Sequence, residues 1–258
     1  MENTVLEIKD LTVAYHNQVI LHNIHLSVPK GKLVGIIGPN GAGKSSLLNA
    51  IMELIPKNNG EIKILGEQLK KVRDKVAFIP QRDSVDWDFP ITVIEVVLMG
   101  RYAKLPWYKK TSAQDKKIAL DCLTKVKMLS FADRHISELS GGEKQRVFIA
   151  RALAQEAEVY CMDEPLVGID ATSEKEIMEI LSAMKNEGKS IFIVHHDLQS
   201  SVEYFDWVIF INRKIIACGE ITSTFTLQNL QNTYGGALSI LTQINQLVTT
   251  TQNSTPSI

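Results

Sequence analysis

The sequence predicts an α/β fold in which helices cover both faces of a parallel β-sheet. Short apolar runs typical of buried strands alternate with segments of helical periodicity along most of the chain. A glycine-rich turn, GPNGAGKS, lies between one such strand and one such helix. That context is the one in which a loop cradles nucleotide phosphates, so we expect a nucleotide-binding domain.

The composition is that of an ordinary globular protein. The chain has 258 residues, of which 45% are hydrophobic and 22% charged, and its formal net charge is −1. This balance argues against a dedicated nucleic-acid binder. The three cysteines are odd in number and form no CxxC pair, which favours reduced thiols over a disulfide frame or a zinc site.

No membrane or export segment is expected from the sequence. The N-terminal residues MENTVLEIKD lack the basic start and apolar run of a signal peptide. No apolar stretch approaches the ~20 residues that a bilayer-spanning helix needs. If the protein works at a membrane, we expect another protein to hold it there.

The first half of the chain begins with strands and then turns helical. Residues 5–37 are strand-like and end in the apolar run KLVGII. After the glycine-rich loop, apolar residues recur at helical spacing (Leu47, Leu48, Ile51 and Leu54). Two further strands are expected at residues 60–66 and 75–81, each bounded by glycine or proline.

The second half begins with a mostly helical stretch, residues 92–154. Strands are expected at residues 159–163 and 190–196, with a helix around 173–187 between them. The last ten residues are polar, and we expect disorder there. The helical stretch carries a basic run, for which a solvated face is the first interpretation and a lipid- or partner-binding surface the alternative (Lys104, Lys109, Lys110, Lys116 and Lys117).

The glycine-rich turn matches the P-loop pattern G-x-x-x-x-G-K-[ST]. Its glycines let consecutive backbone N–H groups curl around phosphates, and the following helix adds about +0.5 of a charge. Lys44 is expected to reach the β- and γ-phosphates, and Ser45 to ligate Mg²⁺. The nucleotide-contacting set is Gly38, Pro39, Asn40, Gly41, Ala42, Gly43, Lys44, Ser45 and Ser46.

A P-loop alone does not name a function. The guanine-reading N-K-x-D segment and the D-x-x-G switch of GTPases do not occur in the chain. Other residues therefore have to decide between the classes of P-loop protein.

Two carboxylates end the apolar run VYCMDEP. Strand alternation points Asp163 and Glu164 in different directions, so they can have different roles. Asp163 fits a Mg²⁺-binding carboxylate. Glu164 could polarise the water that attacks the γ-phosphate, a contribution typically worth ~10²–10⁴-fold in rate. Acidic loop residues after a strand are the alternative.

Three more residues are candidates for the same site. His195 and His196 face opposite ways, and we expect His196 to sense the γ-phosphate at the carboxyl edge of the sheet. Gln81 could reach the metal or the attacking water. Tyr15 could stack on adenine, although its strand position suits a core residue equally well.

Taken in order along the chain, these segments resemble the ATP-binding subunits of ABC transporters. The resemblance runs from Tyr15 to His196 and includes LSGGEKQR at residues 139–146, whose LSGGE is the signature of that family. It implies a RecA-like P-loop NTPase core with an N-terminal antiparallel β subdomain and a helical ABC insert near residues 86–155. The ATP-binding domain would span residues 1–240, with a tail at 241–258.

The resemblance also implies a homodimer with two shared sites. Each ATP would lie between the P-loop of one chain and the signature of the other, where Ser140, Gly141 and Gly142 offer donors to the γ-phosphate. Asp170 would end the D-loop. Tyr160 and Cys161 replace commoner aliphatic residues, and PLVGID replaces a more widespread D-loop sequence. Neither departure puts ATP hydrolysis in doubt.

Two segments, residues 80–102 and 163–170, resemble the manganese, zinc and iron importer branch of this family. The branch implies an ATPase on the cytoplasmic face of the inner membrane, paired with two permease subunits and served by an extracytoplasmic metal-binding protein. Manganese is the first expectation for the cargo, with zinc or iron next. Trp87 and Phe89 are expected to contact the permease, or else to pack under the helical insert.

Three alternatives stay open. An ABC importer for a different small substrate would share these motifs. A non-transport ABC ATPase of DNA repair or the ribosome usually carries a coiled-coil insertion or a second cassette, and the chain has neither. A P-loop module without turnover is disfavoured by Glu164 and His196.

Overall fold

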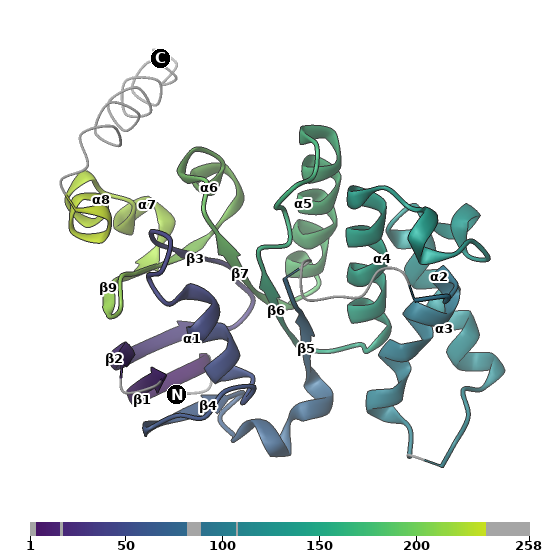
Figure 1. Ribbon diagram of the computed structural model, residues 1–258, viewed down its shortest axis with the longest axis horizontal. Coiled ribbons are helices and arrows are strands. Elements are labelled where there is room, and N and C mark those ends of the chain that lie inside the picture. The colour runs from purple at the N-terminus through teal and green to yellow at the C-terminus, as the bar shows by residue number, and fades with distance from the viewer. Residues whose placement is uncertain (1–3, 16–17, 82–88, 107, 236–258) are drawn as a thin grey trace.

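The fold contains two β-sheets with helices packed between and beside them (Figure 1). The computed structural model describes residues 4–15, 18–81, 89–106 and 108–235. The strands are β1 (Thr4–Tyr15), β2 (Gln18–Pro29), β3 (Leu33–Ile37), β4 (Asn59–Ile64), β5 (Val76–Ile79), β6 (Val159–Asp163), β7 (Ser190–His195), β8 (Trp207–Ile211) and β9 (Ile215–Glu220). The α-helices are α1 (Lys44–Ile51), α2 (Val93–Leu98), α3 (Ala113–Lys125), α4 (Gly141–Ala154), α5 (Ala171–Asn186), α6 (Leu198–Tyr204), α7 (Ile221–Thr224) and α8 (Leu227–Tyr234).

Short 3₁₀ helices connect several of these elements. They are η1 (Leu69–Lys71), η2 (Arg73–Lys75), η4 (Met99–Lys104), η5 (Leu129–Phe131) and η6 (Ile136–Glu138). Among the described residues, no helix is both long enough and apolar enough to cross a bilayer.

The smaller sheet is antiparallel and has the order β2-β1-β4. Leu6 of β1 lies opposite Val28 of β2 and Ile64 of β4, so apolar residues of all three strands meet. These residues are buried, and they cover one face of the larger sheet. The N-terminal antiparallel subdomain expected from the resemblance is therefore present.

The larger sheet has the order β5-β6-β7-β3-β8-β9, with all pairs parallel except β8 and β9. Every residue of β3, β6 and β7 is buried, as expected for strands that are covered on both faces. The P-loop follows β3 in the middle of the sheet, at the carboxyl end where open α/β sheets bind ligands. The predicted fold class is confirmed.

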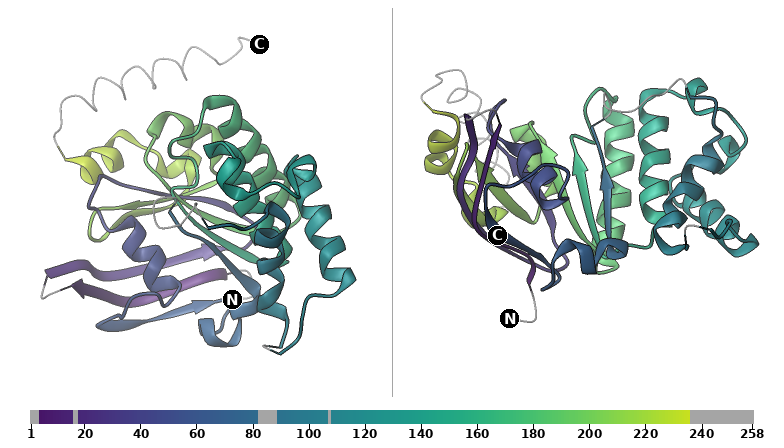
Figure 2. Two further views of the ribbon diagram at one scale, coloured as in Figure 1. Left: turned by 45° about the vertical axis from the view of Figure 1, so that its right-hand side comes forward. Right: turned by 60° about the horizontal axis from the view of Figure 1, so that its bottom comes forward.

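The two faces of this sheet belong to two different cores. On one face Val34, Ile36 and Cys161 pack with α1 and the antiparallel sheet. On the other face Leu33, Tyr160 and Met162 pack with α4 and α5. Helices α1 and α4 therefore lie on opposite faces of one sheet, an arrangement visible in both views of Figure 2.

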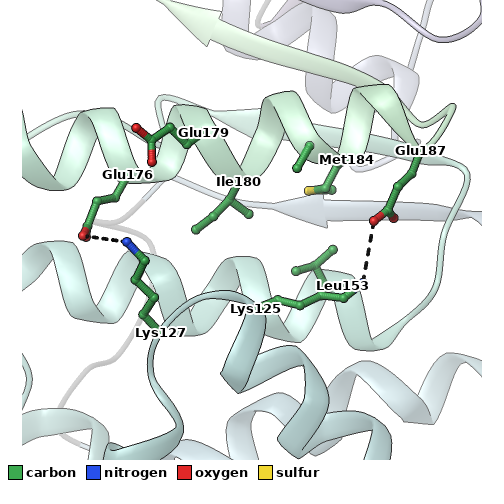
Figure 3. A pocket seen from close by; sticks show the side chains of 9 residues that line it. Lys125, Lys127, Leu153, Glu176, Glu179, Ile180, Met184 and Glu187 are labelled. Atoms are coloured by element: carbon green, nitrogen blue, oxygen red, sulfur yellow. Dashed lines mark hydrogen bonds and ion pairs between the residues drawn. The ribbon is translucent and has the colours of Figure 1, made fainter.

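The helical insert lies between β5 and β6 in the chain and is formed mainly by α2, α3 and α4. It meets the core along α5, where a hollow of about 300 Å³ has an apolar floor that includes Leu153, Ile180 and Met184. Ion pairs Lys127–Glu176 and Lys125–Glu187 bridge this seam at 3.2 and 3.9 Å (Figure 3). The insert is thus attached to the core partly by solvent-exposed charge pairs.

Candidate nucleotide-binding site

The P-loop adopts a backbone that only glycine tolerates well at two positions. Gly41 and Gly43 have φ of 76° and 93°, in the left-handed region. A Cβ on Gly38 would lie 2.1 Å from the carbonyl oxygen of Ile211, so β8 packs directly under the start of the loop. Helix α1 has no side-chain cap, which leaves the N–H groups of its first turn for a ligand.

Lys44 holds its ammonium group against the loop itself. Its Nζ donates to the carbonyl oxygens of Gly38 and Pro39 at 2.9 and 3.1 Å. Burial lowers the pKa of Lys44, and the carboxylates of Glu164 and Asp163 oppose that shift. A polyphosphate would supply the negative charge that a partly buried ammonium group favours.

Ser45 and Asp163 meet although 118 residues separate them in the sequence. Ser45 Oγ donates to Asp163 Oδ1 at 2.9 Å, which joins the first turn of α1 to the carboxyl end of β6. Burial raises the pKa of Asp163, and the Ser45 hydrogen bond opposes that shift. Two oxygen ligands of the kind that Mg²⁺ prefers therefore lie side by side.

Glu164 lines the same cavity as Ser45, the hydrogen-bond partner of Asp163. It follows the last residue of β6 and has a φ of 49°, so the chain bends sharply at this carboxylate. Gln81, two residues after β5, places its Nε2 3.3 Å from Glu164 Oε2. The candidate base and the candidate water-positioning amide are thus in contact.

A cavity of about 370 Å³ opens at the P-loop. Its lining contains every predicted loop residue from Asn40 to Ser46, together with Glu164 and Ile20. Gly38 and Pro39 contribute as acceptors for Lys44 and do not line the cavity. Ile20, from β2, carries no sequence signal that would have marked it.

The two adjacent histidines differ in burial. His195 ends β7 and is buried, whereas His196 lies just beyond the strand and is exposed at the carboxyl edge of the sheet. The Ser200 hydroxyl donates to Asp197 Oδ2 at 2.6 Å, so it accepts at 2.9 Å from Nε2–H of His195. Burial lowers the pKa of His195 to about 4 and keeps the ring neutral. His195 is therefore a structural residue, and His196 is the one available to a ligand.

The signature residues begin α4 at a distance from the P-loop. Ser140 caps the helix in a capping box: its Oγ accepts from the backbone N–H of Glu143, and its own backbone N–H donates to the Glu143 carboxylate. Neither Ser140, Gly141 nor Gly142 lines the cavity at the P-loop. Because α1 and α4 lie on opposite faces of the sheet, one chain does not bring its two glycine-rich turns together.

Gly142 lies against the first turn of α5. A Cβ on Gly142 would be 2.6 Å from Ser173 Oγ and 2.8 Å from Ser173 Cβ, so only glycine fits there. Asp170 caps α5 by accepting from the backbone N–H of Ser173 at 3.0 Å, and that bond is the main cause of its lowered pKa. The predicted signature and D-loop residues are therefore neighbours, and Ser173 is a contact that the sequence did not mark.

Tyr15 lies at the end of β1 and is 38% exposed, which excludes a core position. It pairs with Gln18 of β2, two residues before Ile20 of the cavity wall. Phe89 is 58% exposed, so it does not pack under the helical insert. Trp87, the other residue expected at the permease contact, lies outside the described residues.

The fold and this site define the class of protein: a P-loop nucleoside triphosphatase whose site also contains an acidic strand end and a glutamine. The profile of one family, described as "ABC transporter", matches residues 21–167. The chain belongs to the ABC transporter family. ATP is accordingly its nucleotide, and the chain is an ATPase.

Curated relatives resemble the chain over most of their length. The manganese transport system ATP-binding protein MntB of Bacillus subtilis is 50% identical over 236 residues, which are 92% of this chain and 94% of the relative. The zinc transport system ATP-binding protein TroB of Treponema pallidum is 48% identical over 234 residues, 91% of this chain and 88% of the relative.

Solved structures share the fold. A nucleotide-free ATP-binding cassette from an ABC transporter superimposes with a TM-score of 0.75 at 25% identity, covering 89% of this chain and 94% of that one. An ATP-binding subunit of an ABC transporter gives a TM-score of 0.75 at 26% identity and covers 95% and 100%.

Proposed function

We propose that the chain is the ATPase of a divalent-metal importer and works as a head-to-tail homodimer. The observation that carries the dimer is the placement of α1 and α4 on opposite faces of one sheet. Each chain then contributes one half to each of two sites. Its P-loop belongs to one site, and its signature belongs to the other. A two-fold pairing gives each half its complement.

ATP binding would close this dimer because the nucleotide bridges both halves. Lys44 and the N–H groups of α1 hold the phosphates from one side, while Ser140 and the first N–H groups of α4 approach the γ-phosphate from the other. ATP therefore favours the closed pair over the open one, and that difference in affinity can drive a permease. His196 would contact the γ-phosphate, and Tyr15 would stack on adenine.

The oxygen ligands at the P-loop fit Mg²⁺. Ser45 Oγ and Asp163 Oδ1 are adjacent, and the amide of Gln81 lies near the same strand end. Mg²⁺ is bound in proteins by one or two carboxylates together with phosphate oxygens, which this set provides. When bound, the ion would neutralise charge on the phosphates, while Glu164 would accept a proton from the attacking water.

The proposed cargo rests on the relatives. Relatives named for manganese and zinc transport cover most of this chain at 50% and 48% identity, and manganese is our first choice. Among the described residues, no group of three or more His, Cys, Asp or Glu side chains is placed to hold a metal ion. We assign cargo selection to two permease subunits and an extracytoplasmic binding protein, with this chain on the cytoplasmic face of the membrane.

A groove along the exposed edge of the larger sheet supports the permease contact. It measures about 310 Å³, borders the edge strand β5, and is lined in part by Phe78, Met99 and Ala103. Met99 is 40% exposed although it is apolar. A helix or loop of a permease could bury these groups, and we place the docking site here together with Phe89.

Replacement of Glu164 by Gln tests the proposed site. The amide keeps the size of the side chain but accepts no proton, so we expect ATP binding to persist, hydrolysis to fall by about 10²–10⁴-fold, and an ATP-bound dimer to accumulate. Light scattering after gel filtration with ATP and Mg²⁺ measures the dimer. Normal turnover in the E164Q variant would refute the assigned base, and a variant that binds ATP but stays monomeric would refute the shared site.

A further inference from the structure

The segment from η4 to the start of α3 carries positive charge that its surroundings do not neutralise. Arg101 and Lys104 are paired: Arg101 contacts Asp115 at 2.9 Å and Glu156 at 2.6 Å, and Lys104 contacts Glu156 at 3.1 Å. The charges of these two cations are therefore neutralised by the two carboxylates. Four lysines remain, all exposed, and none forms an ion pair with a described residue (Lys109, Lys110, Lys116 and Lys117).

Apolar side chains accompany these lysines. A surface hollow of about 590 Å³ is lined by Tyr102, Leu105 and Pro106 together with Lys109, Lys110 and Thr111. Tyr102 is 57% exposed and the nearby Tyr108 is 73% exposed. Tyrosine beside lysine is the combination that favours the boundary between lipid headgroups and water.

The segment lies away from the nucleotide site and beside the proposed permease groove. Arg101 donates to the carbonyl oxygen of Ala154 at the end of α4, whereas Ser140 caps its start. The 14 residues of that helix span about 21 Å. Helix η4 contributes Met99 to the groove and Tyr102 to the hollow, so one short helix joins both surfaces. In Figure 1 the connection from η4 to α3 lies at the lower right edge of the molecule.

We propose that this basic hollow, formed by Tyr102, Leu105, Pro106, Lys109, Lys110 and Thr111 and flanked by Lys116 and Lys117, docks on anionic phospholipid headgroups of the membrane. The proposal rests on the proposed place of the chain beneath a permease. Cytoplasmic loops of permeases are themselves enriched in Lys and Arg, so they are poor partners for four unpaired lysines. The phosphodiester groups of an anionic leaflet have the complementary charge, and the tyrosines suit its interface.

Vesicle sedimentation of the full chain without nucleotide tests this. The probes are vesicles of phosphatidylcholine alone and of phosphatidylcholine mixed with phosphatidylglycerol. Each lysine near an anionic surface contributes about fivefold to binding, so replacing Lys109, Lys110, Lys116 and Lys117 by Gln should lower binding to the mixed vesicles by on the order of 10³-fold. High salt should weaken wild-type binding, and phosphatidylcholine alone should bind poorly.

The matched control removes the same charge elsewhere. Lys30, Lys57, Lys70 and Lys214 are exposed and form no ion pair with a described residue, and their replacement by Gln should leave most vesicle binding intact. Equal losses in the two quadruple variants would reduce the effect to net charge and overturn the proposal. The proposal would also be overturned if the quadruple variant at the basic hollow bound vesicles normally but no longer assembled with the permease, because the surface would then bind protein.

This readout is independent of the shared ATP site. A chain that binds anionic vesicles but forms no ATP-bound dimer would count against the proposed function and not against the lipid surface. A chain that forms the dimer but does not bind anionic vesicles would count against the lipid surface and not against the proposed function.

Discussion

Lys44 and Ser140 begin helices that lie on opposite faces of the same six-stranded sheet. In the proposed function both residues contact the phosphates of ATP, yet the sheet separates them within one chain. A site that uses both must therefore draw them from two chains.

Mixing two inactive variants should restore activity. Lys44→Ala removes the ammonium group of the P-loop, and Ser140→Ala removes the hydroxyl of the signature; we expect each to cost on the order of 10²-fold in turnover. A mixed dimer has one complete site, formed by Lys44 of one chain and Ser140 of the other. Steady-state ATPase assays of the mixture should recover up to about a quarter of wild-type activity if chains pair at random.

The controls for this experiment are the separate variants at the same total concentration. Ser140→Ala also removes a helix cap worth about 1 kcal/mol, so thermal unfolding should show that the variant is folded at the assay temperature. No recovery from a mixture of folded chains would mean that each site is built within one chain.

Gly142→Ala should disturb the start of α4 through Ser173. The added methyl group would lie 2.6 Å from Ser173 Oγ and 2.8 Å from its Cβ, and overpacking of this kind costs about 1–3 kcal/mol. We expect a lower melting temperature and weaker formation of the ATP-bound dimer. Differential scanning calorimetry measures the first, and light scattering with ATP the second.

A second substitution separates crowding from loss of phosphate binding. Ser173→Gly removes both crowding atoms and should restore the stability of Gly142→Ala, whereas Ser173→Ala keeps the Cβ and should not. If both second substitutions rescue equally, the contact with Cβ is not what limits the site.

His195 should make the fold sensitive to mild acid. Its pKa is about 4 in the folded chain, against about 6.5 for an unperturbed histidine, so the unfolded chain binds more protons between these values. The stabilising effect is complete above pH 6.5 and is lost as the pH falls toward 4. Between pH 7.5 and pH 5 the free energy of unfolding should fall by about 2 kcal/mol from this group.

Urea unfolding of wild type and of His195→Gln at the two pH values isolates that contribution. Glutamine does not titrate, so the variant should show a smaller difference between pH 7.5 and pH 5. Parallel losses in both proteins would assign the acid sensitivity to other groups.

Met99→Glu should weaken assembly with the permease. A carboxylate in place of the exposed apolar side chain of Met99 would have to be desolvated on docking in the groove beside β5, at a cost of several kcal/mol. Co-purification with tagged permease subunits measures the loss, and the binding of ATP should be unchanged. Leu129→Glu is the control, because Leu129 is an exposed apolar residue of the same insert that does not line the groove.

The segments that form the candidate site leave stronger patterns in the sequence than the frame around them does. The P-loop, Asp163 and Glu164 could be located because a strand, a glycine-rich turn and a helix each leave a local pattern. The contact between Ser45 and Asp163 follows from the shared carboxyl edge of parallel strands, although 118 residues separate the two. The bend at Glu164 has no such pattern, because a positive φ at a non-glycine residue depends on its surroundings.

The region after residue 196 was the main omission. No element was assigned there, although WVIFI at β8 is an apolar run of the buried-strand type. Strand β9 is harder to find, because nearly all its residues are half-buried and burial does not alternate. Strand β8 and the turn that follows it matter to the site: Ile211 lies under Gly38, and the N–H of Arg213 donates to the carbonyl oxygen of Ala42 at 2.8 Å. The boundaries of the domain and its tail stay a prediction.

The close contact between Gly142 and Ser173 would link the two ATP sites of the proposed dimer. In the proposed dimer, the short segment from Glu164 to Asp170 would couple the contact of the signature with the partner's nucleotide to the candidate base of the chain's own site. The two ATP sites of the head-to-tail dimer would then not hydrolyse ATP independently. Their turnover should rise more steeply than linearly with ATP.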